Sequence, residues 1–249
     1  MKSEISSLEL KYVVEEMQDI IDGKIDKVYQ IGKKEFYIQL YVPNKGKKII
    51  KITSNMMYLS SAKQSSERPP GFCEFLRRHL ANGRIREIKQ EGFQRIVTFT
   101  ITTRENTLYL IVELLDPGNV LLCEKDEKGE LKIRNVAENQ IWKDRTLRAR
   151  SVYKLPEQKY NFLDIKKKDL KEIVNNSDKE NLVKTLAIDL SLGGVFSEEL
   201  CLLSGIDKTR KKLKDDEIEK LFNSIKKLKG KKGKANVVRD KEDVIDIVP

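Results

Sequence analysis

The stretch that decides the fold is Arg95-Ile96-Val97-Thr98-Phe99-Thr100-Ile101-Thr102. Its side chains repeat with a period of two, as in a β-strand, where successive side chains point to opposite faces. The same period recurs at residues 36–42 and 108–115, and shorter runs follow at 119–123 and 131–134. Many short strands with hairpin-length gaps predict antiparallel sheets packed face to face.

Two helices accompany these strands. Residues 6–22 have helical spacing, and Ser6 and Glu9 form an S-x-x-E capping box, in which each side chain binds a free backbone N–H of the other residue. Residues 72–81 form the second predicted helix, opened by Pro69-Pro70-Gly71. His79 projects from the middle of its apolar face, which favours a packed, hydrogen-bonded histidine over a catalytic one.

Beyond about residue 158 the alternation stops and helical spacing replaces it. The expected helices are one within residues 162–175, one opened by a capping box of Ser177 and Glu180 and continuing through Leu190, a short one over 197–204 capped by Ser197, and one over 216–229. Gly193-Gly194 breaks the chain between the middle two.

These patterns predict an α+β protein of two domains. Residues 1–158 would form an antiparallel β-sandwich with flanking helices, and residues 159–249 a small all-α helix-two-turn-helix domain with a basic C-terminal segment.

The charge of the chain is positive and local. The 249 residues include 49 Lys or Arg and 39 Asp or Glu, a net charge of +10, and residues 208–241 alone hold 14 Lys or Arg against 5 Asp or Glu. Such an excess indicates a surface that contacts a polyanion, or equally a solvated helix face beside a loop.

Several functional classes are disfavoured. No apolar run is long enough to span a membrane, and the chain begins without the hydrophobic core of a signal peptide, so we expect a cytoplasmic protein. The three cysteines lie far apart and only one histidine is present, which disfavours disulfides, metal sites and Cys-His or Ser-His catalysis. We therefore expect no metal, no cofactor and no enzymatic activity.

Short motifs then occur in an order that is specific when they are taken together. They are residues 6–10, 23–30, 68–80 (RPPGFCEFLRRHL), 83–85, 94–97, 117–122 and 186–207. Their order and spacing resemble the N-terminal region of the NFACT family, which includes the nuclear export mediator factor and the bacterial fibronectin-binding-protein-like ribosome factors. We expect an archaeal member.

The resemblance implies a fold like that of formamidopyrimidine-type DNA glycosylases and a role in ribosome-associated quality control. Its members bind the large ribosomal subunit that carries a stalled peptidyl-tRNA, and they bring an aminoacyl-tRNA, commonly alanyl-tRNA, to extend the stalled chain. Because the family continues into a long coiled coil and an RNA-binding domain, the chain is expected to be an N-terminal fragment or a short relative.

The resemblance also marks two departures. Family members that use tRNA typically carry Asp-Arg at the position of Gln94-Arg95 and Asp at the position of Glu9. Arginine can bind phosphate or a guanine edge with two hydrogen bonds, whereas Gln94 has no charge with which to orient it. The departures bear on tRNA selectivity more than on ribosome binding.

The candidate RNA contacts each have a structural alternative. Glu9 can simply cap a helix, Arg95 can be a surface charge at a strand start, and the two glycines can be backbone hinges. The full set is Glu9, Arg77, Arg78, Arg84, Gln94, Arg95, Gly193, Gly194, Lys208 and Arg210.

The sequence gives less support to three other functions. A DNA glycosylase of this fold needs an N-terminal proline amine and a zinc finger, and the chain begins Met1-Lys2 and lacks the cysteines. A surface adhesin lacks support from a signal or disulfide pattern, and an interaction scaffold would use its basic face only for solubility.

Overall fold

The computed structural model describes residues 3–230, 236–240 and 243–248. The first part of the chain contains α1 (Ser7–Met17), β1 (Lys24–Ile31), β2 (Glu35–Val42), β3 (Gly46–Ile52), β4 (Met57–Ser60), α2 (Gly71–Leu80), β5 (Arg84–Gln90), β6 (Ile96–Thr102), β7 (Thr107–Glu113), β8 (Asn119–Lys125), β9 (Leu131–Val136), β10 (Gln140–Ile141) and β11 (Thr146–Leu147). The remainder contains α3 (Lys167–Asn176), α4 (Leu182–Asp189), α5 (Gly193–Ser204), α6 (Asp215–Gly230), β12 (Asn236–Asp240) and β13 (Asp243–Val248).

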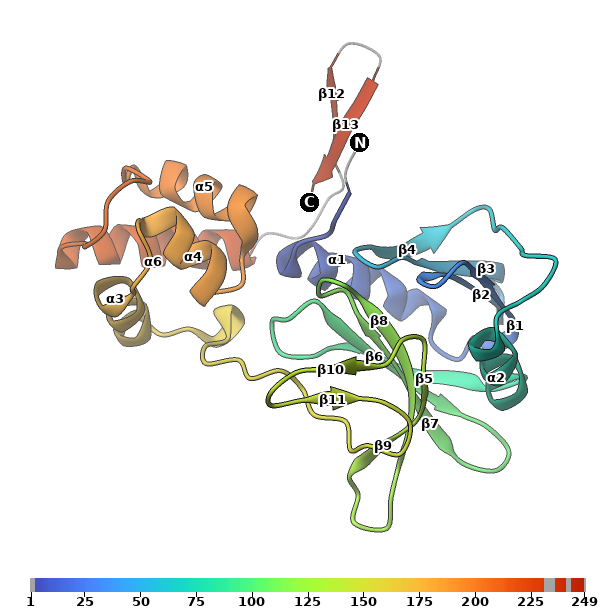
Figure 1. The fold of residues 1–249 in the computed structure, drawn as a ribbon. Coiled ribbons are helices and arrows are strands. Elements are labelled where there is room, and N and C mark those ends of the chain that lie inside the picture. The colour runs from blue at the N-terminus through green and yellow to red at the C-terminus, as the bar shows by residue number, and fades with distance from the viewer. Residues whose placement is uncertain (1–2, 231–235, 241–242, 249) are drawn as a thin grey trace.

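Nine strands form one antiparallel sheet in the order β4-β3-β2-β1-β5-β6-β7-β8-β9. Strands β1 and β5 pair only at Lys24 and Arg84, so the sheet folds over at this corner. Figure 1 shows the two halves, β1–β4 and β5–β9, on either side of a common interior. Buried residues from both halves, Phe36 and Phe99 among them, share one apolar core. This arrangement confirms the predicted antiparallel sandwich.

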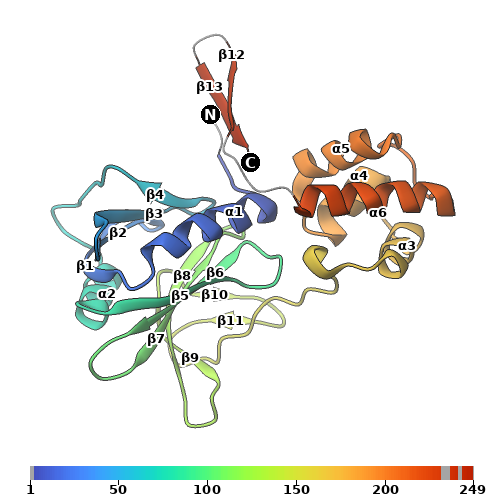
Figure 2. The ribbon, with the colours of Figure 1, turned by 180° about the vertical axis from the view of Figure 1, so that it is seen from behind.

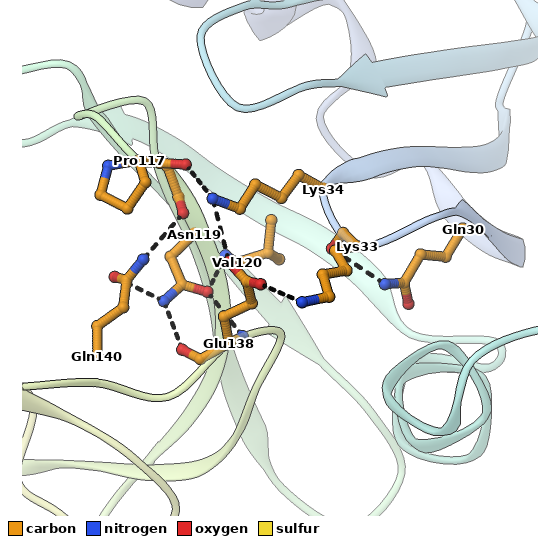
Figure 3. Close-up of polar contacts among 9 residues, drawn as sticks. Gln30, Lys33, Lys34, Pro117, Asn119, Val120, Glu138 and Gln140 are labelled. Carbon is orange, nitrogen blue, oxygen red and sulfur yellow. Dashed lines mark hydrogen bonds and ion pairs between the residues drawn. The ribbon is translucent and has the colours of Figure 1, made fainter.

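A polar cluster joins the two halves away from the corner (Figure 3). The ammonium groups of Lys33 and Lys34, from the β1–β2 turn, lie 3.3 and 3.0 Å from the Glu138 carboxylate beside β10. Lys34 also donates to the Pro117 carbonyl at 2.6 Å, and Asn119 donates to the Glu138 carbonyl at 2.8 Å. Lys33 and Lys34 thus connect the β1–β2 turn of one half to the segments around β8 and β10 of the other.

Helix α1 begins as its sequence indicates. The Ser6 hydroxyl accepts from the Glu9 N–H, and the Glu9 carboxylate accepts from the Ser6 N–H, which confirms the capping box. The α-helix ends at Met17 and a 3-10 turn continues it to Ile20, two residues short of the expected end. In α2, the ring of His79 packs on Phe75 with centroids 4.1 Å apart. Its Nδ1 lies 2.9 Å from the Phe75 carbonyl, as expected for a structural histidine.

Two expectations about the helical part were wrong. Asn181, and not Ser177, caps α4, because its side chain accepts from the Lys184 N–H while the Ser177 hydroxyl donates to Asp189 at 2.8 Å. Helix α5 begins four residues before Ser197, whose hydroxyl instead donates to the Gly193 carbonyl at 2.7 Å.

The helical part of the chain is joined to the sandwich by shared apolar packing. Its core includes Leu8 of α1 and Phe93, which precedes β6, and both are fully buried. Phe93 stacks on Phe162 with centroids 4.9 Å apart, and its N–H donates to the Gln158 side chain at 3.1 Å. Figure 2 shows the helices α3–α6 gathered beside the N-terminal end of α1. The junction therefore fixes the start of α1 against the helical part.

Three cysteines, Cys73, Cys123 and Cys201, are buried thiols. None of the described helices is long and apolar enough to cross a membrane. Across residues 3–230 and the two C-terminal strands, no group of three or more metal-ligating side chains converges.

Candidate nucleic-acid interface

A cleft of about 540 Å³ opens between the start of α1, the residues just before β6 and the turn that joins α4 to α5. Figures 1 and 2 show these segments converging where the sandwich meets the helices. Half of the predicted contact residues line this cleft, namely Glu9, Gln94, Arg95, Gly193 and Gly194. They come from three segments that lie far apart in the sequence.

Glu9 forms part of the wall nearest α1. Its side chain is buried, and its Oε2 accepts from both the backbone N–H and the hydroxyl of Ser6, each at 2.8 Å. The carboxylate therefore fixes the first turn of the helix at the cleft. This is the capping role, and it also holds Ser6 and Ser7 in place along the wall.

Arg95 stands directly before β6 and is partly exposed. Its guanidinium donates to the Glu4 carboxylate at 2.9 Å, and its backbone carbonyl accepts from the Leu114 N–H at 2.8 Å. The backbone is thus held by the sheet, while the charged group is paired with an acidic side chain that is 64% exposed. Sequence reasoning missed Glu4, because nothing in the chain indicates that residues 91 positions apart meet.

Gln94 connects the cleft to the segment that leads into the helices. Its Nε2 donates to the Pro156 carbonyl at 2.8 Å, a bond that a carboxylate at this position could not donate. Among the described residues, its buried Oε1 has no hydrogen-bond partner. The amide therefore stabilises the segment that leads into the helices, and its second polar atom is buried without a hydrogen bond.

The start of α5 forms the opposite wall. Gly193 has a φ of +73°, a left-handed conformation that strongly favours glycine, and Leu192 provides no side-chain cap. A Cβ at Gly194 would meet no protein atom within 4 Å. Among the described residues, no side chain at the N-cap accepts from the first backbone N–H groups of α5, and such a helix start favours an anion.

The lining of the cleft is mixed in charge. Arg95 is the only Lys or Arg among the described lining residues, whereas Glu4, Glu9 and Asp246 are acidic. Recognition here would therefore depend on one arginine and on directed hydrogen bonds rather than on a broad positive field.

The other predicted contacts lie elsewhere. The carbonyls of Lys208 and Arg210 accept from the N–H groups of Val183 and Leu182, so both residues lie at the start of α4, away from its turn into α5. Their side chains pair with Glu198 at 2.7 Å and Glu217 at 3.1 Å.

Arg77 and Arg78 belong to α2, where Arg77 donates to the Val28 carbonyl at 2.7 Å and pairs with Glu74. Arg84 of β5 lies opposite Lys24 of β1 in the sheet, beyond the C-terminal end of α1. The ten candidates thus form one group in the cleft and three separate groups outside it.

The fold and the cleft together define a protein in which a β-sandwich and a helical unit form a polar groove at their junction. Residues 6–246 match the family model of the NFACT N-terminal and middle domains, and the chain therefore belongs to the NFACT family.

Relatives extend this finding. The chain is 29% identical over its whole length to the archaeal Rqc2 homolog aRqcH of Methanocaldococcus jannaschii, covering 39% of that protein. It is 28% identical to the human ribosome quality control complex subunit NEMF, over 91% of this chain and 22% of that one. The chain thus spans less than half the length of these relatives.

Solved structures share the fold. The N-terminal part of the fibronectin/fibrinogen-binding protein of Streptococcus suis superposes with a TM-score of 0.75 at 20% identity, covering 98% of this chain and 90% of that one. The N-terminal domain of PavA from Streptococcus pneumoniae gives a TM-score of 0.67 at 24% identity, over 78% and 77% of the two chains.

Proposed function

We propose that the chain is the RNA-binding part of a ribosome quality control factor, which acts in the cytoplasm on large ribosomal subunits that carry a stalled peptidyl-tRNA. The names of its relatives support a ribosome quality control role. The observation that carries the proposal is the cleft, which collects Gln94, Arg95 and the start of α5 at one place. Its ligand is a tRNA, with alanyl-tRNA the first to test.

The chemistry of the cleft suits a nucleotide. A phosphate can accept from the backbone N–H groups at the start of α5 and from the Arg95 guanidinium. The Gln94 Oε1 is buried, so Gln94 acts by holding the segment at Pro156 and not by contacting the nucleotide through this oxygen. In the free protein Glu4 pairs with Arg95, so the incoming phosphate replaces a carboxylate.

The proposed action is binding and positioning, without bond making by this chain. The cleft holds one arginine and carboxylates that already bind other groups, Glu9 at the helix cap and Glu4 at Arg95. The apolar packing around Phe93 fixes the position of one wall of the cleft relative to the other, so the groove is preformed for its ligand.

The test is tRNA binding by Arg95→Ala, measured by fluorescence anisotropy over a salt series. A lost charge-assisted hydrogen bond is worth about 1.5–3 kcal/mol, so affinity should fall about tenfold or more. Arg134→Ala is the matched control, since Arg134 also lies on the sheet, is partly exposed and pairs with a glutamate, Glu124. Equal effects of the two variants would contradict the proposal.

A further inference from the structure

A row of basic residues and one tyrosine crosses four strands at the corner of the sandwich. Arg84 of β5 lies opposite Lys24 of β1, Lys24 lies opposite Tyr41 of β2, and Tyr41 lies opposite Lys47 of β3. Residues directly opposite one another in antiparallel strands point to the same face, so the four side chains form one row.

This row lies on the outer face of the sheet. The neighbouring residues Ile25, Leu40 and Val42 are buried in the core of the sandwich, and side chains alternate along a strand. All four members of the row are exposed, and the Tyr41 ring is unusually open for a tyrosine in mid-sheet, at 60% of its surface.

Within the part of the chain that the structure describes, the cations of the row have no carboxylate partner. Among the described residues, no ion pair involves Lys24, Lys47 or Arg84. Among the described residues, Arg84 donates to the backbone carbonyl of Asp22, at 3.1 Å, while the Asp22 carboxylate pairs with Arg86. The nearby Asp19 pairs with Lys45 at 3.1 Å. Three cations therefore keep their charge available beside an open aromatic ring.

We propose that this row binds an unpaired segment of RNA. One base would stack on Tyr41, and the phosphates on either side would contact Lys24 and Lys47, which are two strand spacings, roughly 10 Å, apart. Arg84 extends the same line to a further phosphate. An acidic protein surface would use the cations but would gain little from the open tyrosine, whereas a nucleotide carries both an aromatic base and a phosphate.

The row is distinct from the cleft. Lys24 follows the C-terminal end of α1, and the cleft lies at the N-terminal end of this helix, whose 11 residues span about 16 Å. A large RNA could touch both places, but substitutions at one need not affect the other. The row therefore gives Arg84, one of the predicted contacts, a function separate from that of Arg95.

The test compares Tyr41→Ala with Tyr41→Phe on a fluorescent single-stranded RNA of twelve nucleotides and on inorganic polyphosphate of matched charge. Loss of one stacked base should weaken RNA binding by Tyr41→Ala about tenfold, with Tyr41→Phe close to the unsubstituted chain and polyphosphate binding unchanged. Because Tyr41 is exposed, the melting temperature should stay the same in both variants, which excludes unfolding as the cause.

The charges are tested separately. Lys24→Ala combined with Lys47→Ala should reduce the slope of log K against log salt by about 1.4 for the RNA. The matched control is Lys125→Ala with Lys128→Ala, two exposed lysines on and after β8. The proposal is overturned if Tyr41→Ala binds RNA normally, if it loses RNA and polyphosphate equally, or if the control pair lowers the slope as much. Arg95→Ala should leave binding of this RNA unchanged, so failure here and failure of the cleft are separable.

Discussion

The contact between Glu4 and Arg95 allows one prediction to be worked through. If a tRNA phosphate binds Arg95, the Glu4 carboxylate competes with it for the same guanidinium, 2.9 Å away. Replacing Glu4 by alanine removes the competitor and leaves Arg95 in place. Affinity for tRNA should therefore rise, which is unusual for a substitution in a binding cleft.

The expected gain in tRNA affinity follows from how exposed the two side chains are. The Glu4 side chain is 64% exposed and that of Arg95 24%, so this is a partly solvated ion pair. Such pairs are worth about 0–1 kcal/mol, and the gain in affinity is therefore at most about fivefold. The gain should shrink as salt rises, because screening already weakens the pair.

The assay is fluorescence anisotropy with labelled tRNA, on Glu4→Ala, Arg95→Ala and the double variant. The gain should vanish when Arg95 is absent, since the competition acts through its guanidinium. Glu15→Ala, which removes an exposed glutamate paired with Lys11 on α1, is the control for net charge alone. The reasoning is refuted if Glu4→Ala binds tRNA no better than this control, or if its gain persists without Arg95.

The remaining predictions concern stability and reactivity. Gln94→Asp should destabilise the chain by about 1–3 kcal/mol in urea, because it removes the donor to Pro156 and leaves that carbonyl unpaired, and an unchanged midpoint would contradict this account. Hydrogen bonds from Lys34, and then from Lys33, hold the pKa of the Glu138 carboxyl below its usual value. The ionised carboxylate therefore stabilises the fold above the pKa that Glu138 has in the unfolded chain, and this contribution is lost as pH falls through the pKa of the folded chain. Glu138→Gln should accordingly lower the free energy of unfolding at pH 7, and its difference from the unsubstituted chain should shrink in acid. A difference that does not depend on pH would show that the ion pairs do not contribute in this way. Burial raises the pKa of Cys123 to about 12, so at pH 8 this thiol should react with a maleimide only after denaturant is added, and rapid labelling of the folded chain would show that β8 is not buried as described.

Much of the fold could be predicted because it depends on local signals. The alternation over residues 96–102 reports a strand with one face in the core, and the capping box of Ser6 and Glu9 involves groups three positions apart. The sandwich itself follows, since both sheet halves carry apolar residues that must be covered.

The two errors concern helix starts, where neighbouring residues offer different starting points for the same helix. Ser177 and Glu180 have the spacing of a capping box, but Asn181 stands closer to the apolar run and satisfies the Lys184 N–H instead. Ser197 is preceded by Gly193, whose left-handed φ lets the chain turn and start the helix earlier. Propensity alone does not decide which acceptor a free N–H will use.

The site was only partly predictable, for a different reason. Arg95 and Gly193 line the same cleft because Phe93 and Leu8 pack into the helical core, a long-range contact with no local signal. For the same reason the sequence could not separate Arg84 and Lys208 from the cleft, although charge placed all of them among the candidates.

The most direct measurement is photocrosslinking of bound tRNA from two positions on α5. Val195 lines the cleft and is 66% exposed, whereas Leu202 of the same helix is 77% exposed and is not among the lining residues. A photoreactive amino acid at position 195 should crosslink tRNA, with Arg95→Ala reducing the yield, and the same group at position 202 should crosslink weakly. Equal yields from both positions, or a yield from position 202 alone, would contradict tRNA binding in the cleft.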